Sequence, residues 1–301
     1  MRFCRATVQV PWLHAAKSSR VPPDRLGRHA VPLGTTMEGH TFALPIRGRN
    51  MLITGDPRSG KSWATGLYCE QLILQGYCVW VVDPEGDYGT LECLPAVVGM
   101  AGEASLPSLG HLARALQYPD ISVVVDLSRV PLQEKLAHLN SLLPMLAAHR
   151  QSTGLPHRIV VDEAHYFLHE PNCRQLLDLD LGAYTLVTSR PSDLNRDLLK
   201  AIEFTAATRV TDSRSLHALM AMSNGKGDDA QLKSMLRDLT VNEVVILPGI
   251  TAGKNPQLIR LLPRLTPQSA TGSSISMFAS WKGKDSCLPA AARALGLPLA
   301  A

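Results

Sequence analysis

The fold is decided by one stretch, Met51-Leu52-Ile53-Thr54-Gly55-Asp56-Pro57-Arg58-Ser59-Gly60-Lys61-Ser62. It begins with an apolar run and passes into Gly-x-x-x-x-Gly-Lys-Ser, the Walker A pattern of a phosphate-binding loop. Apolar residues at helical spacing follow over residues 63–72. The motif therefore stands between a buried strand and a helix, where its chemistry requires it, and it predicts a nucleotide-binding protein.

Each residue type in this loop has a chemical reason. Two glycines let the backbone turn tightly, so that successive N–H groups point at a phosphate. The helix that begins near residue 60 presents its N-terminal N–H groups and its dipole to the same anion. We expect Lys61 to reach the β- and γ-phosphates of ATP and the Ser62 hydroxyl to complete a Mg²⁺ shell. The residues expected to line the nucleotide are Gly55, Asp56, Pro57, Arg58, Ser59, Gly60, Lys61, Ser62 and Trp63.

A second chemical signal is an apolar strand, Ile159 to Val161, that ends in Asp162 and Glu163. This is the Walker B arrangement. Asp162 is expected to hold Mg²⁺, directly or through water, and Glu163 to orient and deprotonate the attacking water. Because burying a carboxylate is costly, two acids at the end of a buried strand indicate a catalytic site once a Walker A loop precedes them. His165 fits either a nucleotide sensor or a hydrogen-bonded structural residue, and we assign it no catalytic role.

Two further strands end in polar residues. The strand over 77–82 leads into Asp83-Pro84-Glu85-Gly86-Asp87-Tyr88. Its three acids fit a place near Mg²⁺, a contact with a neighbouring subunit, or simply a polar loop. The strand over 184–188 leads into Ser189-Arg190-Pro191. Ser189 is the best candidate there for a catalytic contact with the γ-phosphate or the attacking water, although an ordinary strand end has the same local pattern.

The order of the elements predicts one α/β domain over residues 31–265. Near-continuous apolar runs that end in polar loops are typical of parallel strands buried on both faces. We therefore expect a mainly parallel sheet flanked by helices, with central strands at 51–53, 79–82, 123–127, 159–162 and 186–189. Residues 1–30 are irregular and basic, which fits an arm that touches an acidic partner or a solvated end. Residues 266–301 predict a poorly ordered tail.

Composition limits the function classes. The 301 residues are 45% hydrophobic, and 30 basic against 26 acidic side chains give a net charge of +4. That excess neither demands nor excludes nucleic acid. Six scattered cysteines without a Cys-x-x-Cys pair predict reduced thiols, not a metal site or a disulfide framework. No apolar run approaches the roughly 18 residues of a membrane span, and residues 1–20 lack the apolar core of a signal peptide, so we expect a cytoplasmic protein.

Taken together and in this order, the motifs resemble the HerA/FtsK superfamily of P-loop ATPases, and in particular its bacterial HerA-like group. The resemblance implies a RecA-like core with an extra strand between the two Walker strands. It also implies ring hexamers, an arginine supplied by the neighbouring subunit, and pumping of double-stranded DNA. Ser189 departs from the Gln that many members have at the sensor position, and the sequence after Leu265 lacks the usual basic, aromatic ending. The motifs that carry the resemblance are the loop at 55–62, Asp83 to Tyr88, Val161 to His165 and Ser189 to Ser192.

Other classes share part of this pattern. Asp162-Glu163-Ala164-His165 also suits a DEAH-type helicase, but no second RecA-like domain with an arginine-rich motif follows. A small-molecule kinase accounts for Walker A but not for a catalytic Glu, because a kinase must keep water out. The alternative that stays open is an ATP-driven switch that assembles or gates a partner protein, for instance a nuclease or a secretion channel.

The Walker motifs lack the arginine that phosphoryl transfer commonly uses. Arg58 is expected to face outward, and Arg190 to support its own strand end. Arg209 and Arg214 flank the end of a strand predicted at 204–210 and are the candidate fingers toward an adjacent subunit. For each of them alone, a solvated or salt-bridged surface position is the simpler interpretation. Arg237 and the tail are the next places to search.

Overall fold

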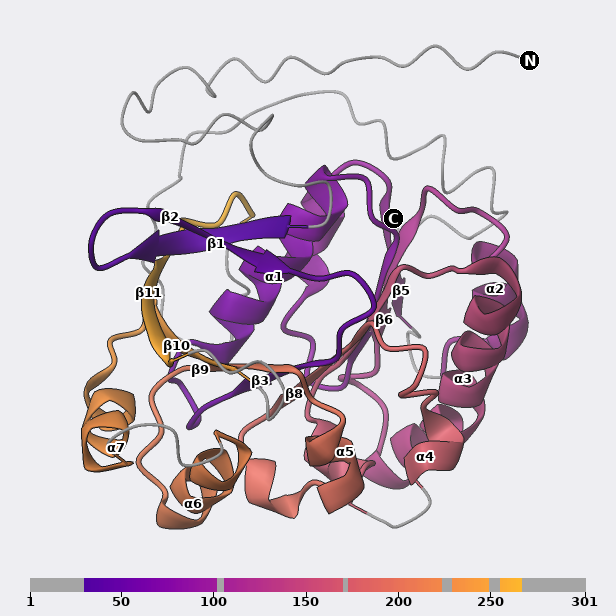
Figure 1. Cartoon of the computed structure of the whole chain (residues 1–301). Helices are drawn as coiled ribbons and strands as arrows, with labels where there is room; N and C mark the ends of the chain where they lie inside the picture. The colour runs from indigo at the N-terminus through magenta and orange to yellow at the C-terminus, as the bar shows by residue number, and fades with distance from the viewer. Residues whose placement is uncertain (1–29, 102–105, 170–172, 224–228, 249–254, 267–301) are drawn as a thin grey trace, which may run out of the picture.

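The computed structural model describes residues 30–101, 106–169, 173–223, 229–248 and 255–266 (Figure 1). The proposed arm and tail therefore lie outside the described residues, apart from Ala30 and Thr266. The described strands form one eleven-stranded sheet in the order β2-β1-β11-β10-β9-β3-β8-β7-β4-β6-β5. They are β1 (Ala30–Thr36), β2 (Thr41–Pro45), β3 (Met51–Thr54), β4 (Val79–Asp83), β5 (Val97–Ala101), β6 (Ser122–Asp126), β7 (Arg158–Val161), β8 (Tyr184–Thr188), β9 (Phe204–Ala207), β10 (Glu243–Pro248) and β11 (Gln257–Leu261).

The helices of the described ranges are mostly short. The α-helices are α1 (Lys61–Leu74), α2 (Leu109–Ala115), α3 (Leu132–Thr153), α4 (Cys173–Leu176), α5 (Arg196–Lys200), α6 (Ser213–Met222) and α7 (Asp229–Asp238). Three 3-10 turns lie between them, namely η3 (Gly89–Cys93), η4 (Ala164–Tyr166) and η5 (Pro191–Asp193).

The sheet has a parallel part and an antiparallel part. From β9 through β3, β8, β7, β4 and β6 to β5, every neighbouring pair is parallel. The other four strands, β10, β11, β1 and β2, extend the sheet with antiparallel pairs. The prediction of a mainly parallel sheet is confirmed, and all five expected central strands belong to its parallel part. β8 lies between β3 and β7, so the extra strand between the two Walker strands is also present.

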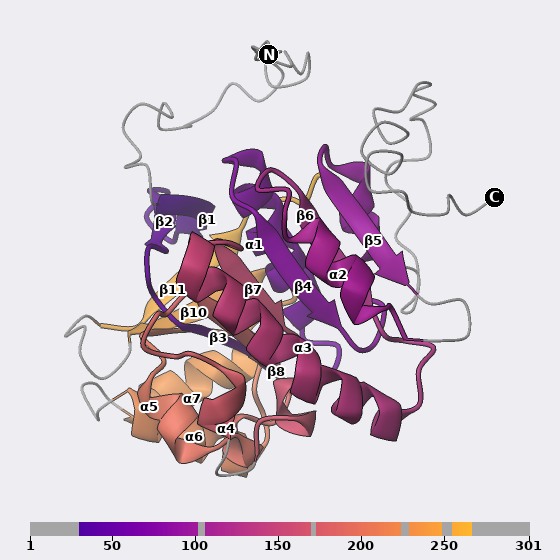
Figure 2. The same ribbon diagram turned by 90° about the vertical axis from the view of Figure 1, so that its right-hand side faces the viewer.

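Helices cover the sheet on both faces and create two cores (Figures 1 and 2). The larger core contains buried side chains of α2, α3, α5, α6 and α7. The smaller one lies between the sheet, α1 and η3. Successive residues of a strand point to opposite faces, so Trp80 and Val82 of β4 join the larger core while Val79 and Val81 join the smaller one. Strands buried on both faces explain the near-continuous apolar runs in the sequence.

Local contacts explain where some elements end. α1 ends where expected, because Gly76 takes a φ of 84° after the C-cap. β9 stops at Ala207, short of the expected Val210, because Ala207 pairs with Thr54, the last residue of β3. The weakly patterned stretch over 91–116 holds an edge strand, β5, and the short helix α2.

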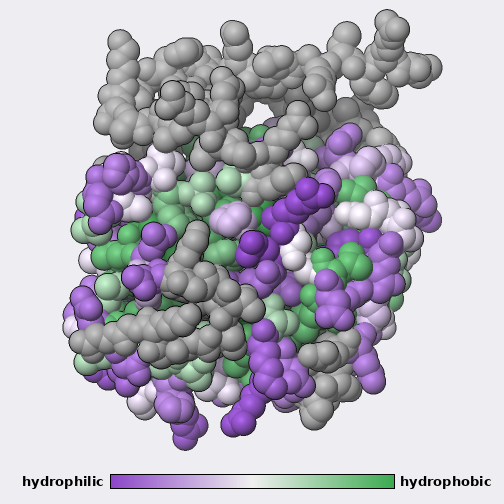
Figure 3. All heavy atoms as spheres, viewed as in Figure 1, coloured by the Kyte–Doolittle hydropathy of each residue, from purple (hydrophilic) through white to green (hydrophobic). Residues whose placement is uncertain are grey.

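The surface is mixed in character. Figure 3 shows polar and apolar residues side by side on the face of Figure 1, with the apolar ones gathered mainly on its left half. No helix within the described ranges is long and apolar enough to cross a lipid bilayer.

Candidate nucleotide-binding site

The loop between β3 and α1 contains two positions that only glycine fits. Gly55 has a φ of 156°, and a Cβ there would lie 1.8 Å from the hydroxyl of Thr208. Gly60 has a φ of 99°, and a Cβ there would lie 2.5 Å from the carbonyl oxygen of Val241. Both the backbone angle and the close neighbours exclude a side chain. The Walker A glycines therefore let the loop pack against the connections that follow β9 and α7.

Hydrogen bonds fix the shape of this loop. Asp56 donates its N–H to the carbonyl of Arg209 at 2.9 Å, and its carboxylate accepts from the N–H and hydroxyl of Thr211 at 2.9 and 2.6 Å. The Ser59 hydroxyl lies 2.6 Å from that of Thr208. Asp56 and Ser59, both expected to line the nucleotide, thus brace the loop against the β9–α6 connection. Pro57 and Arg58 are exposed at its tip, with Arg58 facing solvent as expected.

The first turn of α1 is open to an anion. Its N-cap, Gly60, provides no side-chain cap, and no acidic residue stands in the first turn. The N–H groups at this helix end thus keep the arrangement that binds phosphate. Lys61 is 8% exposed, and its Nζ is 3.5 Å from the carbonyl of Asp56, a long and weak hydrogen bond. Trp63 is half-buried, and the guanidinium of Arg264 lies over its ring at 5.7 Å.

The turn after β4 reaches this loop. The Ser62 hydroxyl donates to Asp87 Oδ2 at 2.5 Å. Asp83 shapes the turn, because its carboxylate accepts the backbone N–H groups of Gly86, Asp87 and Tyr88 at 2.8 to 3.1 Å. Of the three interpretations that the sequence left open for this turn, the structure therefore supports the place beside the expected Mg²⁺ ligand Ser62.

Carboxylates crowd the carboxyl ends of β4 and β7. Asp83 is fully buried, and burial raises its pKa to about 6. Asp162 is 3% exposed, and its pKa is raised well above the ordinary value, by burial first and then by the neighbouring Glu163 and Asp83. Such shifts mark negative charges that have little compensation. A bound cation would therefore be stabilised by the carboxylates at this edge of the sheet.

Glu163 lies at the turn after β7. Its φ of 45° is left-handed, and its N–H donates to Asp162 Oδ1 at 2.8 Å. This turn breaks the alternation of the strand and keeps both acids at one edge. Burial raises the pKa of Glu163, while Lys61 lowers it. β8 lies between β3 and β7 and pairs in parallel with both, so the Walker A loop and the Walker B turn leave the sheet at the same edge, as the predicted sheet requires.

The end of β8 completes the arrangement. The Nδ1 atom of His165 lies 3.0 Å from the Thr188 hydroxyl and 3.2 Å from Glu163 Oε2. The sequence alone did not single out Thr188, because the polar residue that follows the strand, Ser189, was the more obvious candidate. In the structure Thr188 is buried and Ser189 is half-buried. Arg190, expected to support its own strand end, donates its backbone N–H to the Thr188 hydroxyl at 3.0 Å at the end of β8. One signal in the sequence pointed to Thr188: it is a hydroxyl residue that directly follows the apolar pair Leu186-Val187 at the end of the strand.

The arginine candidates belong to three different segments, the β9–α6 connection, α6 and α7. Arg209, Arg214 and Arg237 are all exposed. The backbone of Arg209 is hydrogen-bonded to the chain's own Walker A loop, whereas Arg214 stands in the first turn of α6. All three stay candidates for a contact with another subunit.

The donors at this edge fit Mg²⁺. Ser62, Asp87 and Asp162 offer hydroxyl and carboxylate oxygens, the hard ligands that Mg²⁺ prefers. Within the described ranges, no group of three or more His, Cys, Asp or Glu side chains is arranged to hold a metal by itself.

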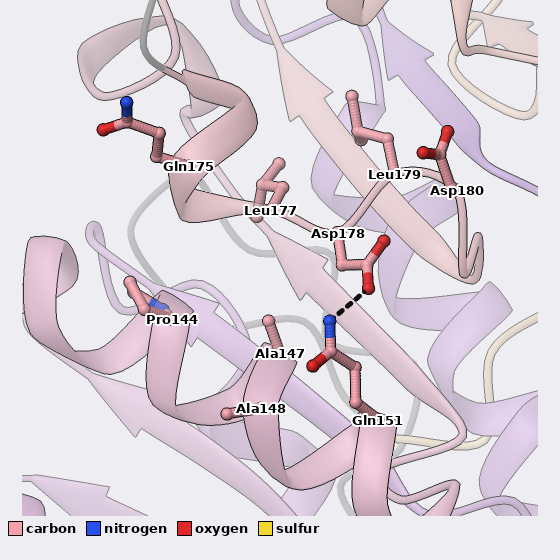
Figure 4. A pocket seen from close by; sticks show the side chains of 9 residues that line it. All are labelled: Pro144, Ala147, Ala148, Gln151, Gln175, Leu177, Asp178, Leu179 and Asp180. Atoms are coloured by element: carbon pink, nitrogen blue, oxygen red, sulfur yellow. Dashed lines mark hydrogen bonds between the residues drawn. The ribbon is translucent and has the colours of Figure 1, made fainter.

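A pocket of about 390 Å³ lies away from this site, between the second half of α3 and residues 175–180 (Figure 4). Gln151 donates to Asp178 across it at 2.6 Å. Residues 175–180 precede β8, so the pocket lies toward the amino ends of the strands. It shares no residue with the nucleotide site.

Comparisons with known proteins identify the fold. No family model and no curated protein matches the sequence. Among solved structures, VirB4 of Thermoanaerobacter pseudethanolicus is 13% identical with a TM-score of 0.59, over 78% of this chain and 97% of VirB4. The genome-packaging NTPase B204 from Sulfolobus turreted icosahedral virus 2, in complex with AMPPCP, is 14% identical with a TM-score of 0.51, over 72% of this chain and 98% of B204.

The sheet order and the glycine-shaped loop together define a RecA-like fold with a P-loop. Identities this low show a shared fold and nothing finer. The fold shared with VirB4 and B204 agrees with the RecA-like core that the resemblance implied.

Proposed function

We propose that the chain hydrolyses ATP. One observation carries the proposal: the Ser62 hydroxyl of the Walker A motif donates to Asp87 at 2.5 Å, in the turn after β4, and β4 pairs in parallel with β7, which leads into Asp162 and Glu163. Lys61 and the N–H groups of the loop bind the phosphates. Glu163 orients and deprotonates the attacking water, and Ser189 contacts the γ-phosphate or that water.

The proposed cofactor is Mg²⁺, held by Ser62 and Asp162 with Asp87 beside them. When bound, it neutralises charge on the β- and γ-phosphates. The protein's own part is to hold these oxygens at one edge, which the Ser62–Asp87 hydrogen bond and the three N–H groups on Asp83 support.

The proposed task is movement or unwinding of double-stranded DNA by a ring of six copies. The support is the fold shared with B204, described as the DNA-packaging ATPase of Sulfolobus turreted icosahedral virus, at a TM-score of 0.50. A finger arginine from the adjacent copy, Arg209 or Arg214, completes each site. The chain works in the cytoplasm, where ATP and DNA meet, with a nuclease or another protein as a candidate partner.

The ATPase domain is proposed to span residues 31–265, between the basic arm and the tail. Limited proteolysis with mass spectrometry tests this. We expect a stable fragment close to these bounds, and cleavage first inside 31–265 contradicts it.

The decisive experiment measures ATP turnover with and without duplex DNA, beside the mass of the assembly in nucleotide. We expect Mg²⁺-dependent turnover that DNA stimulates and a ring-sized mass. Lys61→Ala should weaken binding of a fluorescent ATP analogue. Turnover that is indifferent to DNA favours the switch that assembles or gates a partner, and no turnover in any arm refutes ATP hydrolysis.

A further inference from the structure

His165 joins two strand ends of the nucleotide site. One atom, Nδ1, lies 3.2 Å from Glu163 Oε2 at the end of β7 and 3.0 Å from the Thr188 hydroxyl at the end of β8. The His165 side chain is 5% exposed and that of Glu163 19%. Water therefore competes little for these contacts, and each one is worth more than on the surface.

The Nδ1 atom of His165 cannot donate one proton to both the Glu163 carboxylate and the Thr188 hydroxyl. Burial lowers the pKa of His165 to about 4, so the ring is neutral at pH 7 and carries one proton. A protonated Nδ1 faces Glu163 Oε2, a buried oxygen that no described residue hydrogen-bonds in this structure, and a small turn of the carboxylate lets that oxygen accept the proton. A bare Nδ1 accepts the proton of the Thr188 hydroxyl and turns a lone pair toward Glu163. The tautomer of His165 is therefore tied to the place of the Glu163 carboxylate.

The other end of this chain of contacts is fixed to the backbone. The Thr188 hydroxyl accepts the N–H of Arg190 at 3.0 Å, so its position follows the turn that leads into η5. Glu163 has a left-handed backbone whose N–H donates to Asp162 and whose carbonyl accepts from Tyr166, while its carboxylate Oε2 has no hydrogen-bond partner among the described residues. The direction of its carboxylate depends on what that carboxylate meets.

We propose that His165 is a positioning residue that holds the Glu163 carboxylate and couples it to Thr188 at the end of β8. The inference rests on the proposed ATP hydrolysis. A change at the end of β8, beside the expected phosphate contact Ser189, reaches Glu163 through the Thr188 hydroxyl and the imidazole. The position of the Glu163 carboxylate then depends on the position of the Thr188 hydroxyl at the end of β8.

Kinetics of matched variants test the coupling. His165→Ala and Thr188→Val should each lower kcat about 10-fold, since misplacing a catalytic group by about 1 Å can cost as much as 10²-fold. KM should change less than about twofold. His165→Asn and Thr188→Ser, which keep a polar group, should recover much of the rate. The double variant should be no slower than the slower single one, because both break the same chain of contacts.

Thr185→Val is the matched control, since Thr185 lies on the same strand and points to the opposite face. It should leave kcat unchanged. Melting temperatures and binding of a fluorescent ATP analogue separate misfolding from misplacement. Wild-type kcat in His165→Ala, or strictly additive losses in the double variant, would overturn the proposal.

A second readout does not need turnover. In protein labelled with ¹⁵N-histidine, the ring shifts of His165, assigned by their loss in His165→Asn, report its tautomer. They should show the proton on Nδ1 in the wild type and change in both Glu163→Gln and Thr188→Val. If the ring ¹⁵N shifts of His165 are the same in the wild type and in both variants, the coupling is refuted. Absent turnover with these shift changes intact refutes only the proposed function, whereas normal turnover with unchanged shifts refutes only this inference.

Discussion

The Walker A loop and the acidic edge meet at one site but are built in opposite ways. The loop is braced by its own chain, through Asp56 to Thr211 and through Ser59 to Thr208. The acidic edge gathers Asp83, Asp87, Asp162 and Glu163, whose neighbours are largely one another. The loop is braced before nucleotide arrives, while the carboxylates of the edge outnumber the cations that act on Glu163 there, Lys61 and Arg190. The comparison indicates that the Walker A loop binds phosphate through its preformed shape, whereas the acidic edge depends on added cations to balance its charge.

The largest effect should come from a cation that another copy supplies. Losing an arginine finger can cost roughly 10³–10⁵ in rate. We expect Arg209→Ala or Arg214→Ala to bind ATP and assemble but to hydrolyse slowly. Mixing that variant with Lys61→Ala should restore part of the activity, because an intact loop then meets an intact finger.

Turnover of mixed and unmixed samples at equal total concentration provides the measurement. Full activity in both single variants excludes both arginines and directs the search to Arg237 and the tail.

Glu163 separates binding from chemistry at the acidic edge. Glu163→Gln removes the base and keeps the size of the side chain, so ATP binding should persist while kcat falls roughly 10²–10⁴-fold. Single-turnover rates and nucleotide affinity, measured on one preparation, check this. Near wild-type turnover would falsify its role as the base.

The charge of the acidic edge should appear in stability. The pKa of Asp83 rises from 3.8 to about 6 on folding, so the folded chain binds this proton more tightly than the unfolded chain. The stability that this gives is fully present below about pH 4 and is lost as the pH rises through 6, by roughly 3 kcal/mol at about 1.4 kcal/mol per pKa unit. Asp162 and Glu163, also raised, act in the same direction.

Denaturant unfolding between pH 4 and 8 measures this slope. Asp83→Asn should flatten the dependence of unfolding free energy on pH, and MgATP should reduce it. Asp120→Asn, at an exposed position, should leave this dependence unchanged. A slope of the opposite sign contradicts the unbalanced charge assigned to this edge.

The smallest effect concerns the bracing of the loop. Thr208→Val removes a hydroxyl that lies 2.6 Å from Ser59 Oγ and 3.2 Å from the Thr54 carbonyl. We expect a loss of about 1 kcal/mol in unfolding free energy, with weaker nucleotide binding. Thr208→Ser keeps the hydroxyl and should restore both. Equal nucleotide affinity in all three proteins would show that the loop holds its shape without this brace.

Much of this site could be predicted from local sequence. The Walker A loop and the Asp162-Glu163 pair stand where strands end, and parallel strands bring those ends to one edge. The contact of Asp87 with Ser62 could only be offered as one of three alternatives. It depends on the pairing of β4 with β7 and on the path of one turn, which periodicity does not encode.

By itself, the sequence determined that apolar runs become buried strands, that glycines at 55 and 60 shape a phosphate loop, and that two acids follow a strand. These follow from local backbone geometry and the cost of burying charge. Only the tertiary structure decided which distant groups meet. Thr188 reaches His165, and Glu70 of α1 forms a buried ion pair with Arg264 at 2.8 Å, 194 residues away in sequence. Such contacts arise when sheet order and helix packing bring remote segments together, and no pattern within a short window of sequence records that order.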